Sequence, residues 1–367
     1  MPNRVELIHV DVPMTEPFRI SSGTVESKQS IVIRIVQDGV AGFGEASPMT
    51  GGFYSNETPE STFRYLAEIA VPAMLDEGSF SPEFVERRVS KTGSNPFAWA
   101  GIDGALWDLR AARSGRSISQ LLGLEPRPVE CGLAVGIYPT VAELIQACES
   151  YLRDGYKRVK IKIEPGWDLE PLRALRETFG GIPLMVDANA SYSEKDFPVF
   201  DEIDRLGLTM VEQPLAKGNL EGHARLQARI TTPVCFDESA SDEETVLKAI
   251  RMGACRVVNV KVQRVGGLAP AIRICDLCAV HGIPCWVGTM PELGIGALHA
   301  LYLAAHPNCV YPTDVEASSR WFVEDLIDPP ISVRDGIIEI DPAHRIRPRV
   351  NLDAIDRYAI KSRTVSR

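Results

Sequence analysis

The segment from Val159 to Lys261 repeats one pattern five times, in which a short apolar run ends in a charged residue. The five runs are VKIK (159–162), PLMVD (183–187), LTMVE (208–212), PVCFD (233–237) and VVNVK (257–261). Their last residues follow one another at intervals of 25, 25, 25 and 24 positions. Helix-length amphipathic segments separate the runs, which predicts consecutive βα units with parallel strands.

The charged residues that end these runs are Lys162, Asp187, Glu212, Asp237 and Lys261. In consecutive βα units they project from the same end of one barrel, and the C-terminal end of a (β/α)8 barrel carries the active site. A single strand-end charge could simply meet solvent. Five charges at the same place in successive units favour a reaction centre of three carboxylates bracketed by two lysines.

The whole chain is predicted to be an α/β protein, a modified TIM-type (β/α)7–8 barrel with an α+β capping domain. The capping domain is expected at residues 1–125, with strands at 3–12, 29–38 and 41–46, irregular substrate loops at 15–28 and 47–58, and helices at 59–75, 81–91 and 97–113. The barrel follows at residues 126–325, with strand one at 129–135, strand seven at 283–287 and strand eight near 309–311. Residues 326–367 are expected to return to the capping domain through small strands at 331–333 and 336–340, and to end in a solvated polar tail.

Composition narrows the class of protein. The chain has 367 residues, with 39 Lys and Arg against 49 Asp and Glu, which gives a formal charge of −10. An acidic balance argues against a nucleic-acid surface, which needs a basic face. No apolar leader or uninterrupted apolar run of membrane-spanning length is present. We therefore expect a cytoplasmic enzyme that works on small molecules, with no membrane partner.

The eight cysteines lie between positions 131 and 309, mostly inside apolar runs. This distribution fits reduced, buried thiols in a cytosolic protein. Cys275 and Cys278 have the CxxC spacing of metal and redox motifs, but no second CxxC pair exists and the segment is an amphipathic helix. We interpret this pair as helix-core thiols.

Asp187, Glu212 and Asp237 offer only carboxylate oxygens, which suit a hard divalent ion, Mg²⁺ or Mn²⁺, better than zinc. None of the six histidines ends a central strand, which excludes a His-ligated hydrolase centre. The chain also lacks a P-loop, and no GxGxxG follows a strand to open a helix. The residues therefore predict a magnesium site made of carboxylates.

The lysines have a second role in this prediction. Lys160 and Lys162 alternate with apolar residues, so both point into the barrel, where an ammonium group needs a charged partner. Lys261 ends strand six, across the barrel from strand two. Desolvation and neighbouring positive charge should lower the lysine pKa values, making one a usable base. The metal would hold a substrate carboxylate while a lysine removes the α-proton, giving an enediolate.

Several motifs resemble those of the enolase superfamily, in its muconate-lactonising subgroup. They are KIK (160–162), VDAN (186–189), VEQP (211–214), DES (237–239) and NVK (259–261). Further stretches narrow the resemblance to o-succinylbenzoate synthases and N-succinylamino acid racemases. These are GYKRVKIKIEPGW (155–167), MPELGIG (290–296), Asp314 with ASSR (317–320), and GFY (52–54) with Glu57 and Thr58. The resemblance covers essentially the whole chain.

This resemblance implies Mg²⁺ on Asp187, Glu212 and Asp237, with Lys162 and Lys261 as the acid/base pair and a homo-oligomeric assembly. In the synthase reaction, the dehydration of a cyclohexadiene carboxylate in menaquinone synthesis, Lys162 would abstract the proton and Lys261 would stabilise the ring. In racemisation each lysine would act on one face. The residues expected to bind or support substrate are Lys160, Asn189, Glu238, Tyr54, Phe18, Arg264, Met290, Glu292 and Leu293.

The chain also departs from the family pattern. Ala134 stands where serine is common, Val262 and Gln263 replace Pro-Gly, and Thr289 and Leu293 occupy positions that hold smaller residues in the family. These departures leave the substrate open. Muconate cycloisomerisation and dipeptide epimerisation remain alternatives, although the Asp-x-Asp pair of an epimerase is incomplete at Asp314. A barrel that binds a metal-chelated acid without catalysis is a third, but it would not need two opposed bases.

Overall fold

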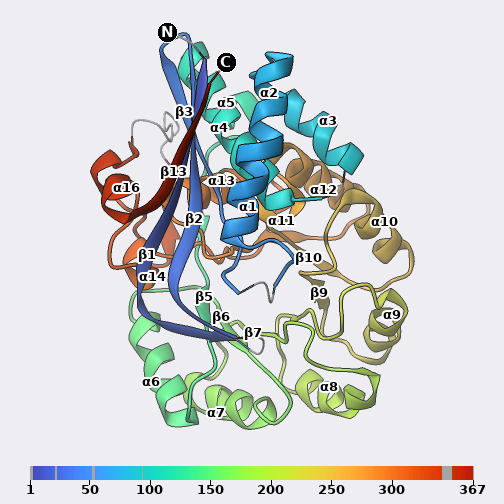
Figure 1. The fold of residues 1–367 in the computed structure, drawn as a ribbon. Helices are drawn as coiled ribbons and strands as arrows, with labels where there is room; N and C mark the ends of the chain where they lie inside the picture. Colours follow the sequence, from blue (N-terminus) through green and yellow to red (C-terminus); the bar gives the residue numbers. More distant parts are fainter. Residues whose placement is uncertain (1–2, 21–22, 52–53, 93, 341–348, 367) are drawn as a thin grey trace.

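The computed structural model describes residues 3–20, 23–51, 54–92, 94–340 and 349–366. An antiparallel sheet with helices packed against it forms one end of the molecule, and a curled parallel sheet ringed by helices forms the other (Figure 1). The predicted α/β class, with a barrel under an α+β capping domain, is confirmed. The domain boundaries at residues 125 and 325 stay predictions.

The capping sheet has the strand order β13-β1-β2-β3. Its strands are β1 (Arg4–Ile20), β2 (Gly23–Gln37), β3 (Val40–Ala46) and β13 (Ala359–Ser366), and its helices are α1 (Pro59–Tyr65), the π-helix η1 (Leu66–Ala70), α2 (Val71–Glu77), α3 (Pro82–Thr92), α4 (Pro96–Ser114) and α5 (Ile118–Leu122). Gly42 and Gly44 bring β3 and α4 into direct backbone contact. A Cβ on Gly42 would lie 2.3 Å from the Ala105 carbonyl oxygen, so any larger residue would push the helix off the sheet.

The irregular loop expected at residues 15–28 is instead a continuation of the β1–β2 hairpin. The two strands stay paired up to Arg19 and Thr24, with a register shift between Pro13 and Phe18. Prolines cannot donate to a strand ladder and therefore suggest a loop, but the irregular stretch accommodates them. The hairpin rests on the barrel, because the Ile137 N–H donates to the Arg19 carbonyl at 2.9 Å.

The barrel sheet has seven parallel strands among the described residues, in the order β11-β10-β9-β8-β7-β6-β5. They are β5 (Leu133–Val135), β6 (Val159–Lys162), β7 (Leu184–Asp187), β8 (Val211–Glu212), β9 (Val234–Phe236), β10 (Val257–Val260) and β11 (Cys285–Val287). The surrounding helices are α6 (Val141–Leu152), α7 (Leu169–Phe179), η2 (Glu194–Asp196), α8 (Phe197–Asp204), α9 (Leu220–Arg229), α10 (Glu243–Arg251), α11 (Val262–Val265), α12 (Leu268–Val280), α13 (Gly294–Ala304) and α14 (Ser318–Trp321).

The eighth strand expected near residues 309–311 is not a regular strand. Single parallel bridges join Cys285 to Cys309 and Cys131 to Thr313, and these close the ring between β11 and the start of the barrel. Pro312 lies between the two bridges and has no N–H to extend a ladder. The closing seam of the barrel is therefore held by side chains as much as by backbone pairing.

The C-terminal segment was predicted incorrectly in two respects. Strand β12 (Ile337–Ile338) pairs with β4 (Val129–Glu130) at the start of the barrel, not with the capping domain. The tail expected to be solvated contains α16 (Leu352–Tyr358) and then β13, which pairs antiparallel with β1. Strand β13 lies at a sheet edge and is exposed along almost its whole length, so its sequence shows no buried face. Because the segment is polar, the sequence interpretation did not predict that it forms a strand.

Helix α13 carries a buried histidine against the capping domain. The His299 ring leaves no room for a Cβ on Gly104 of α4, which would lie 2.3 Å from the ring. Burial lowers the pKa of His299 to about 3 from its ordinary 6.5. Because burial favours the neutral ring, a lower pH shifts the balance toward the unfolded chain, in which His299 can be protonated. The contribution of neutral His299 to the free energy of unfolding is complete above pH 6.5 and is lost as the pH falls toward 3.

We therefore expect His299 to contribute to acid unfolding. Lowering the pH from 6.5 to about 4.5 should cost roughly 2 kcal/mol through this one residue. The His299→Leu variant removes the titrating group, so its free energy of unfolding should fall less steeply over this range. Urea unfolding at a series of pH values measures both slopes, and parallel slopes would contradict the assignment.

Within the described ranges, no helix is both long and apolar enough to cross a membrane.

Candidate active site

The strand register brings the carboxylates of β7 and β8 side by side. Lys162 is the Cα partner of Asp187, and Asp187 is the partner of Glu212. Asp237 follows β9 directly. The side chains of Asp187, Glu212 and Asp237 are fully buried, and one carboxylate oxygen of each lies within 4.8 Å of the others. The evenly spaced carboxylates of the sequence thus lie at the same height at the end of the barrel.

Lysines contact these carboxylates from both sides. The Lys162 Nζ donates to Asp187 Oδ2 at 2.5 Å, and the Lys261 Nζ donates to Asp237 Oδ2 at 2.9 Å. Their strands, β6 and β10, are separated in the sheet by β7, β8 and β9. Both lysines are almost completely buried. Two ammonium groups therefore flank the carboxylates from opposite sides.

Lys160 lies one layer deeper in the barrel. Its Nζ is 3.1 Å from Glu212 Oε2, 3.5 Å from Asp187 Oδ2 and 2.5 Å from Asp314 Oδ2. The ammonium also lies 5.0 Å from the centre of the Trp286 ring. Both Lys160 and Lys162 point inward, as their alternation predicted. Lys160 touches two of the predicted metal ligands and closes the floor of the site.

The carboxylates influence one another strongly. Burial raises the pKa of Glu212 to about 7, and the charge of Asp187 adds to this effect. Burial also favours the neutral form of Asp187, but the charges of Lys162 and Lys160 outweigh it and lower its pKa. For Asp237 the charges of Lys261 and Arg264 likewise overcome burial and lower the pKa. Burial, with the charge of Asp187 added to it, thus makes Glu212 the weakest acid of the three.

The groups that the chain itself supplies raise the pKa values of Lys261 and Lys160. Burial alone would lower the pKa of Lys261, but the charge of Asp237 outweighs it and the pKa is raised. Lys160 behaves in the same way, because Asp314, Glu212 and Asp187 surround it. The prediction assumed that positive charges near the lysines would lower their pKa values. The nearest groups that the chain itself supplies are carboxylates, which raise them.

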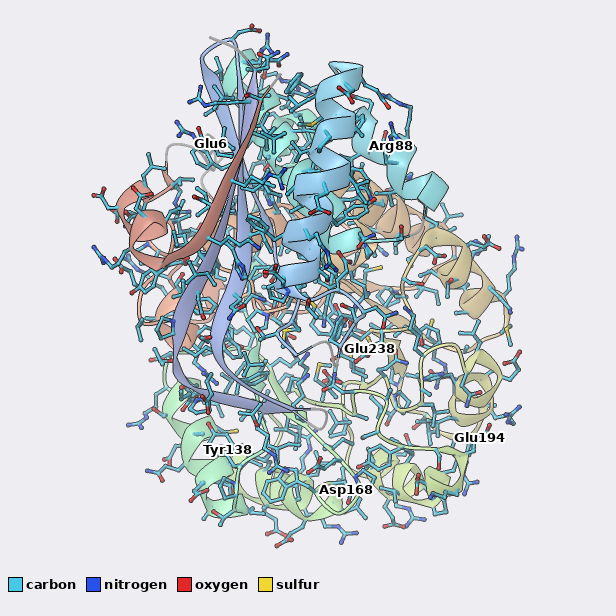
Figure 2. The ribbon with its side chains drawn as sticks, viewed as in Figure 1. Glu6, Arg88, Tyr138, Asp168, Glu194 and Glu238 are labelled. Carbon is cyan, nitrogen blue, oxygen red and sulfur yellow. The ribbon has the colours of Figure 1, made fainter. Side chains whose placement is uncertain are left out.

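Backbone geometry and unpaired oxygens support a cation at this place. Asn189, Ala190 and Gln213 directly follow the carboxylate strands and adopt positive φ values of 40°, 61° and 38°. Such strain in non-glycine residues gathers at functional sites. Asn189 donates from Nδ2 to Glu238 Oε1 at 3.1 Å, while its Oδ1 and the Glu238 Oε2 are buried without a hydrogen-bond partner among the described residues. Figure 2 shows Glu238 near the middle of the molecule, where the capping domain meets the barrel.

The donor chemistry fits a hard divalent cation. Three buried carboxylates with only oxygen ligands match the preference of Mg²⁺, and the approach of their oxygens suits a single ion. A cation among them would also favour the charged form of Glu212, whose pKa burial raises to about 7. Asp187, Glu212 and Asp237 are therefore the residues that would hold the metal.

Tyr54 and Arg264 cover Asp237 from the side of the capping domain. The Tyr54 hydroxyl donates to Asp237 Oδ1 at 3.2 Å and accepts from Arg264 at 3.2 Å. The Lys261 Nζ lies 4.9 Å from the centre of the Tyr54 ring, and Arg264 also donates to Asp237. Tyr54 thus lies against the lysine and the carboxylate, as the second-loop prediction implied. Phe53, its expected neighbour, falls outside the described residues.

The remaining predicted substrate residues are buried at different depths. Phe18 packs edge-on against Trp321 at a ring distance of 4.8 Å, so it anchors the hairpin on the barrel. The Met290 carbonyl accepts from Lys28 at 2.8 Å, and the Met290 N–H donates to Glu292. Leu293 is fully buried within the barrel core. That Leu293 faces the substrate stays a prediction.

A buried charge network fixes the capping domain over the site. Glu45 of β3 accepts from the backbone of Leu293 at 3.0 Å and of Gly296 at 2.8 Å. Burial raises the pKa of Glu45 to about 7 and lowers that of Lys28 to about 8. Gln263, one of the departures from the family pattern, donates to the Glu45 carbonyl and accepts from the Ser47 N–H. This departure therefore ties the start of the second loop to the barrel.

Three residues near the site were missing from the predicted set. Asp314 accepts from Arg158 at 2.6 Å and pairs with Lys160, and Asn259 donates to Glu212 Oε1 at 2.7 Å. Asn259 could have been found, because it precedes Lys261 by two positions and shares its side of the strand. Asp314 was singled out by its motif, but its contact with Lys160 was not predicted, because it follows the irregular eighth segment and has no strand pattern to place it.

Tyr54 offers a test of the capping contact. We expect Tyr54→Ala to raise KM about 10-fold and to change the order of preference among substrates, because it removes a wall of the site and a hydroxyl bonded to Asp237. Tyr54→Phe keeps the ring and should show a smaller rise in KM. Steady-state kinetics on a set of acyl-amino acids measures both, and unchanged KM and preference in Tyr54→Ala would rule the contact out.

Comparison with known proteins now places the chain in a family. Residues 4–123 match the family described as "Mandelate racemase / muconate lactonizing enzyme, N-terminal domain", and residues 143–344 match "Enolase C-terminal domain-like". The chain therefore belongs to the enolase superfamily. Its chemistry is the metal-dependent abstraction of a proton α to a carboxylate, and the buried Asp187, Glu212 and Asp237 triad is typical of the metal site.

Individual relatives narrow the subgroup. The chain is 40% identical to an o-succinylbenzoate synthase of Geobacillus stearothermophilus over 96% of its own length and 95% of that protein. It is 39% identical to an N-succinylamino acid racemase of an Amycolatopsis species, covering 89% of each chain. A crystal structure of an enolase-superfamily member from Listeria innocua superposes with a TM-score of 0.94 at 31% identity, covering 100% of this chain and 99% of the other. The resemblance read from the motifs is confirmed.

Proposed function

We propose that this protein is an o-succinylbenzoate synthase that also racemises N-succinylamino acids. Both reactions begin when a base removes the proton α to a carboxylate. The observation that carries the proposal is the pair of buried ammonium groups, Lys162 and Lys261, on opposite sides of one carboxylate triad. The similarity to a named synthase and a named racemase supports both activities on one scaffold.

The roles of the residues follow from their positions. Mg²⁺, when bound by Asp187, Glu212 and Asp237, would supply positive charge to the substrate carboxylate and acidify the α-proton. Lys162 takes the proton from one face. Lys261 is positioned to donate a proton to the other face in racemisation, or to stabilise negative charge on the ring in the dehydration. Lys160 stays with Asp314 and Glu212 and keeps the floor of the site positively charged.

Dipeptide epimerisation is a weaker candidate. An epimerase would use a pair of free carboxylates after the eighth strand to bind the ammonium group of a dipeptide. Here Asp314 is already engaged by Arg158 and Lys160, and Glu316 accepts from the Ala134 N–H at 2.8 Å and faces Arg320. Both acids thus bind groups of the protein itself. Muconate cycloisomerisation has no comparable observation for or against it, and simple binding would not require two opposed lysines.

Deuterium exchange tests the shared first step. The protein is incubated with Mg²⁺ in D₂O with a pool of N-succinyl and N-acetyl amino acids, and a one-unit mass gain is sought in each. Exchange with N-succinylamino acids supports the racemase activity. The synthase activity is assayed separately by following formation of the aromatic product from the cyclohexadiene precursor. Failure of both assays, together with exchange on dipeptides, would overturn the proposal.

A further inference from the structure

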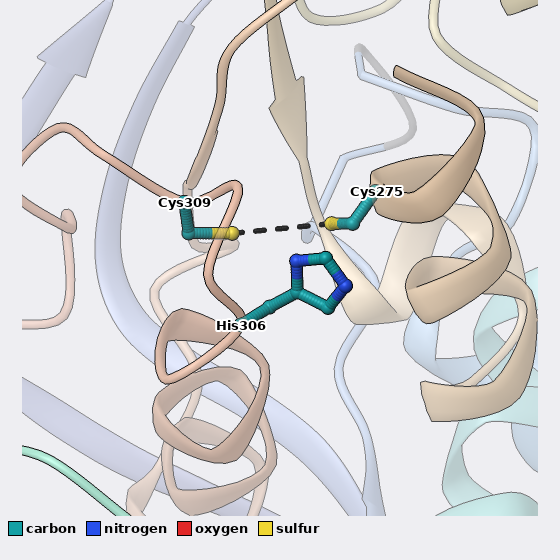
Figure 3. Close-up of side chains that lie close together, drawn as sticks. All are labelled: Cys275, His306 and Cys309. Carbon is teal, nitrogen blue, oxygen red and sulfur yellow. Dashed lines mark hydrogen bonds between the residues drawn. The ribbon is translucent and has the colours of Figure 1, made fainter. Parts of the chain in front are cut away.

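A cluster of thiols and one imidazole lies on the outer side of the barrel wall, away from the carboxylate triad. Cys275 belongs to α12, His306 follows α13, and Cys309 lies in the irregular eighth segment (Figure 3). One ligand atom of each lies within 4.8 Å of the others, and the two sulfurs are 3.9 Å apart. All three residues are buried. Segments that are far apart in the chain thus converge with metal-binding side chains.

Two more thiols border this triangle. Hydrogen bonding to Cys285 and Cys309 raises the pKa of Cys275, and hydrogen bonding to Cys285 raises that of Cys278. Cys285 also accepts from Asn308 at 3.4 Å. Four of the eight cysteines of the chain therefore meet in one place, although they come from α12, β11 and the eighth segment.

Each nitrogen of the His306 ring has a hydrogen-bond partner, which fixes the orientation of the ring. The Asn308 N–H donates to His306 Nδ1 at 3.1 Å, so Nδ1 carries a lone pair and the neutral ring has its proton on Nε2. Nε2 lies 3.0 Å from Asp276 Oδ1 and donates to it. In Figure 3 the nitrogen next to the ring carbon that carries the side chain, Nδ1, faces the two sulfurs. A histidine that ligates a metal commonly donates its second nitrogen to a carboxylate in this way.

We propose that Cys275, Cys309 and His306 bind a structural Zn²⁺ ion. Zinc prefers thiolate and imidazole ligands in a tetrahedron, and Zn–S bonds of about 2.3 Å place two sulfurs about 3.8 Å apart. The observed separation of 3.9 Å matches that edge without movement of the backbone. Binding releases the thiol protons and replaces the Asn308 hydrogen bond to Nδ1.

This proposal revises the interpretation of Cys275 and Cys278 as plain helix-core thiols. A disulfide would use two sulfurs and would leave the imidazole and the remaining thiols without a reason to converge. The chain has no second CxxC pair because the other two ligands, His306 and Cys309, come from the segment that follows α13. Only the closure of the barrel brings them together.

The cluster also has an access route and a structural task. A surface cavity of about 530 Å³ is lined by Asp276, His306, Pro307 and Asn308 and reaches the imidazole from outside. The single bridge between Cys285 and Cys309 is part of the seam that closes the barrel in place of an eighth strand. Zinc bound to His306, Cys309 and Cys275 of α12 would fasten the Cys309 side of that seam.

Metal analysis of the purified protein tests the proposal independently of the reaction at the carboxylates. Protein made under reducing conditions with added zinc is dialysed against EDTA, and its zinc is measured by mass spectrometry. We expect about one zinc per chain to remain, with little left in Cys275→Ser and Cys309→Ser. The matched control is Cys148→Ser, which removes a buried thiol on α6 outside the cluster and should retain the zinc.

A visible absorption spectrum of the unaltered protein tests the site without relying on variants, which could fail to fold. Protein grown with Co²⁺ in place of zinc should show the intense visible bands of a tetrahedral ion and absorption from thiolate ligands. Absence of retained metal in the unaltered protein, retention in Cys275→Ser, or a Cys275–Cys309 disulfide found after alkylation of the native chain would each overturn the proposal.

Discussion

Replacing Lys261 by alanine should lower turnover about 10²–10⁴-fold, the range that a positioned acid or base contributes. Lys261 donates to Asp237 at 2.9 Å and is almost completely buried, so no water or neighbouring side chain can easily take its place. Metal affinity should be spared, because Asp237 keeps Arg264 as a partner and loses only a competitor for its oxygen. Steady-state kinetics and calorimetric titration with Mg²⁺ measure the two effects.

The matched variant Lys162→Ala sharpens this test. If each lysine serves one face of the substrate, each variant should lose racemisation but keep α-deuterium exchange with one enantiomer, and the two variants should keep opposite enantiomers. Lys217→Ala, at an exposed lysine, controls for the loss of a positive charge and should behave as the unaltered protein. Unchanged turnover in Lys261→Ala, or the same enantiomer retained by both variants, would contradict the two-base assignment.

Glu212→Gln should show the second large effect. The change keeps the shape of the side chain but removes a charged ligand from the centre of the triad, where Lys160 and Asn259 already hold both oxygens. We expect Mg²⁺ affinity to fall by more than the roughly 10–100-fold that is typical of losing an outer partner of a metal ligand. Turnover should fall with it and recover only partly at high Mg²⁺.

Asn259→Ala distinguishes the role of the Glu212 carboxylate from that of the amide that orients it. This variant leaves the Glu212 carboxylate in place and removes the amide that orients it at 2.7 Å. Its Mg²⁺ affinity should fall about 10–100-fold, less than in Glu212→Gln. Titration of both variants with Mg²⁺, followed by calorimetry, gives the order. Equal affinities in Glu212→Gln and the unaltered protein would remove Glu212 from the metal site.

The barrel could be predicted from the sequence because charged residues recur at a regular interval at the ends of its strands. Lys162, Asp187 and Glu212 are cross-strand partners, so a spacing of 25 residues translated directly into neighbouring positions. The hairpin within residues 15–28 was predicted as a loop, and its pairing is in fact irregular, with a register shift between Pro13 and Phe18. Strand β13 was lost because an edge strand with both faces exposed has no apolar period to find.

The site was predictable to the extent that strands position it. Residues at strand ends, such as Asp237 and Lys261, were placed correctly relative to one another. Asp314 and Arg158 form a buried pair that lies between distant segments, and no local pattern announces such a partner. The raised pKa of Lys261 also depends on a balance of burial against contacts, which only the three-dimensional arrangement supplies.

The pairing of β13 with β1 has a consequence for how the protein is made. Arg4 pairs with Ser366, so the outer edge of β1 must wait for its neighbour until the ribosome has delivered the entire barrel. During synthesis the nascent capping sheet carries an open edge, which is the kind of surface that invites pairing with another chain. Residues 359–366 cover this edge only after the barrel has been made, so until then the new chain is open to aggregation at β1.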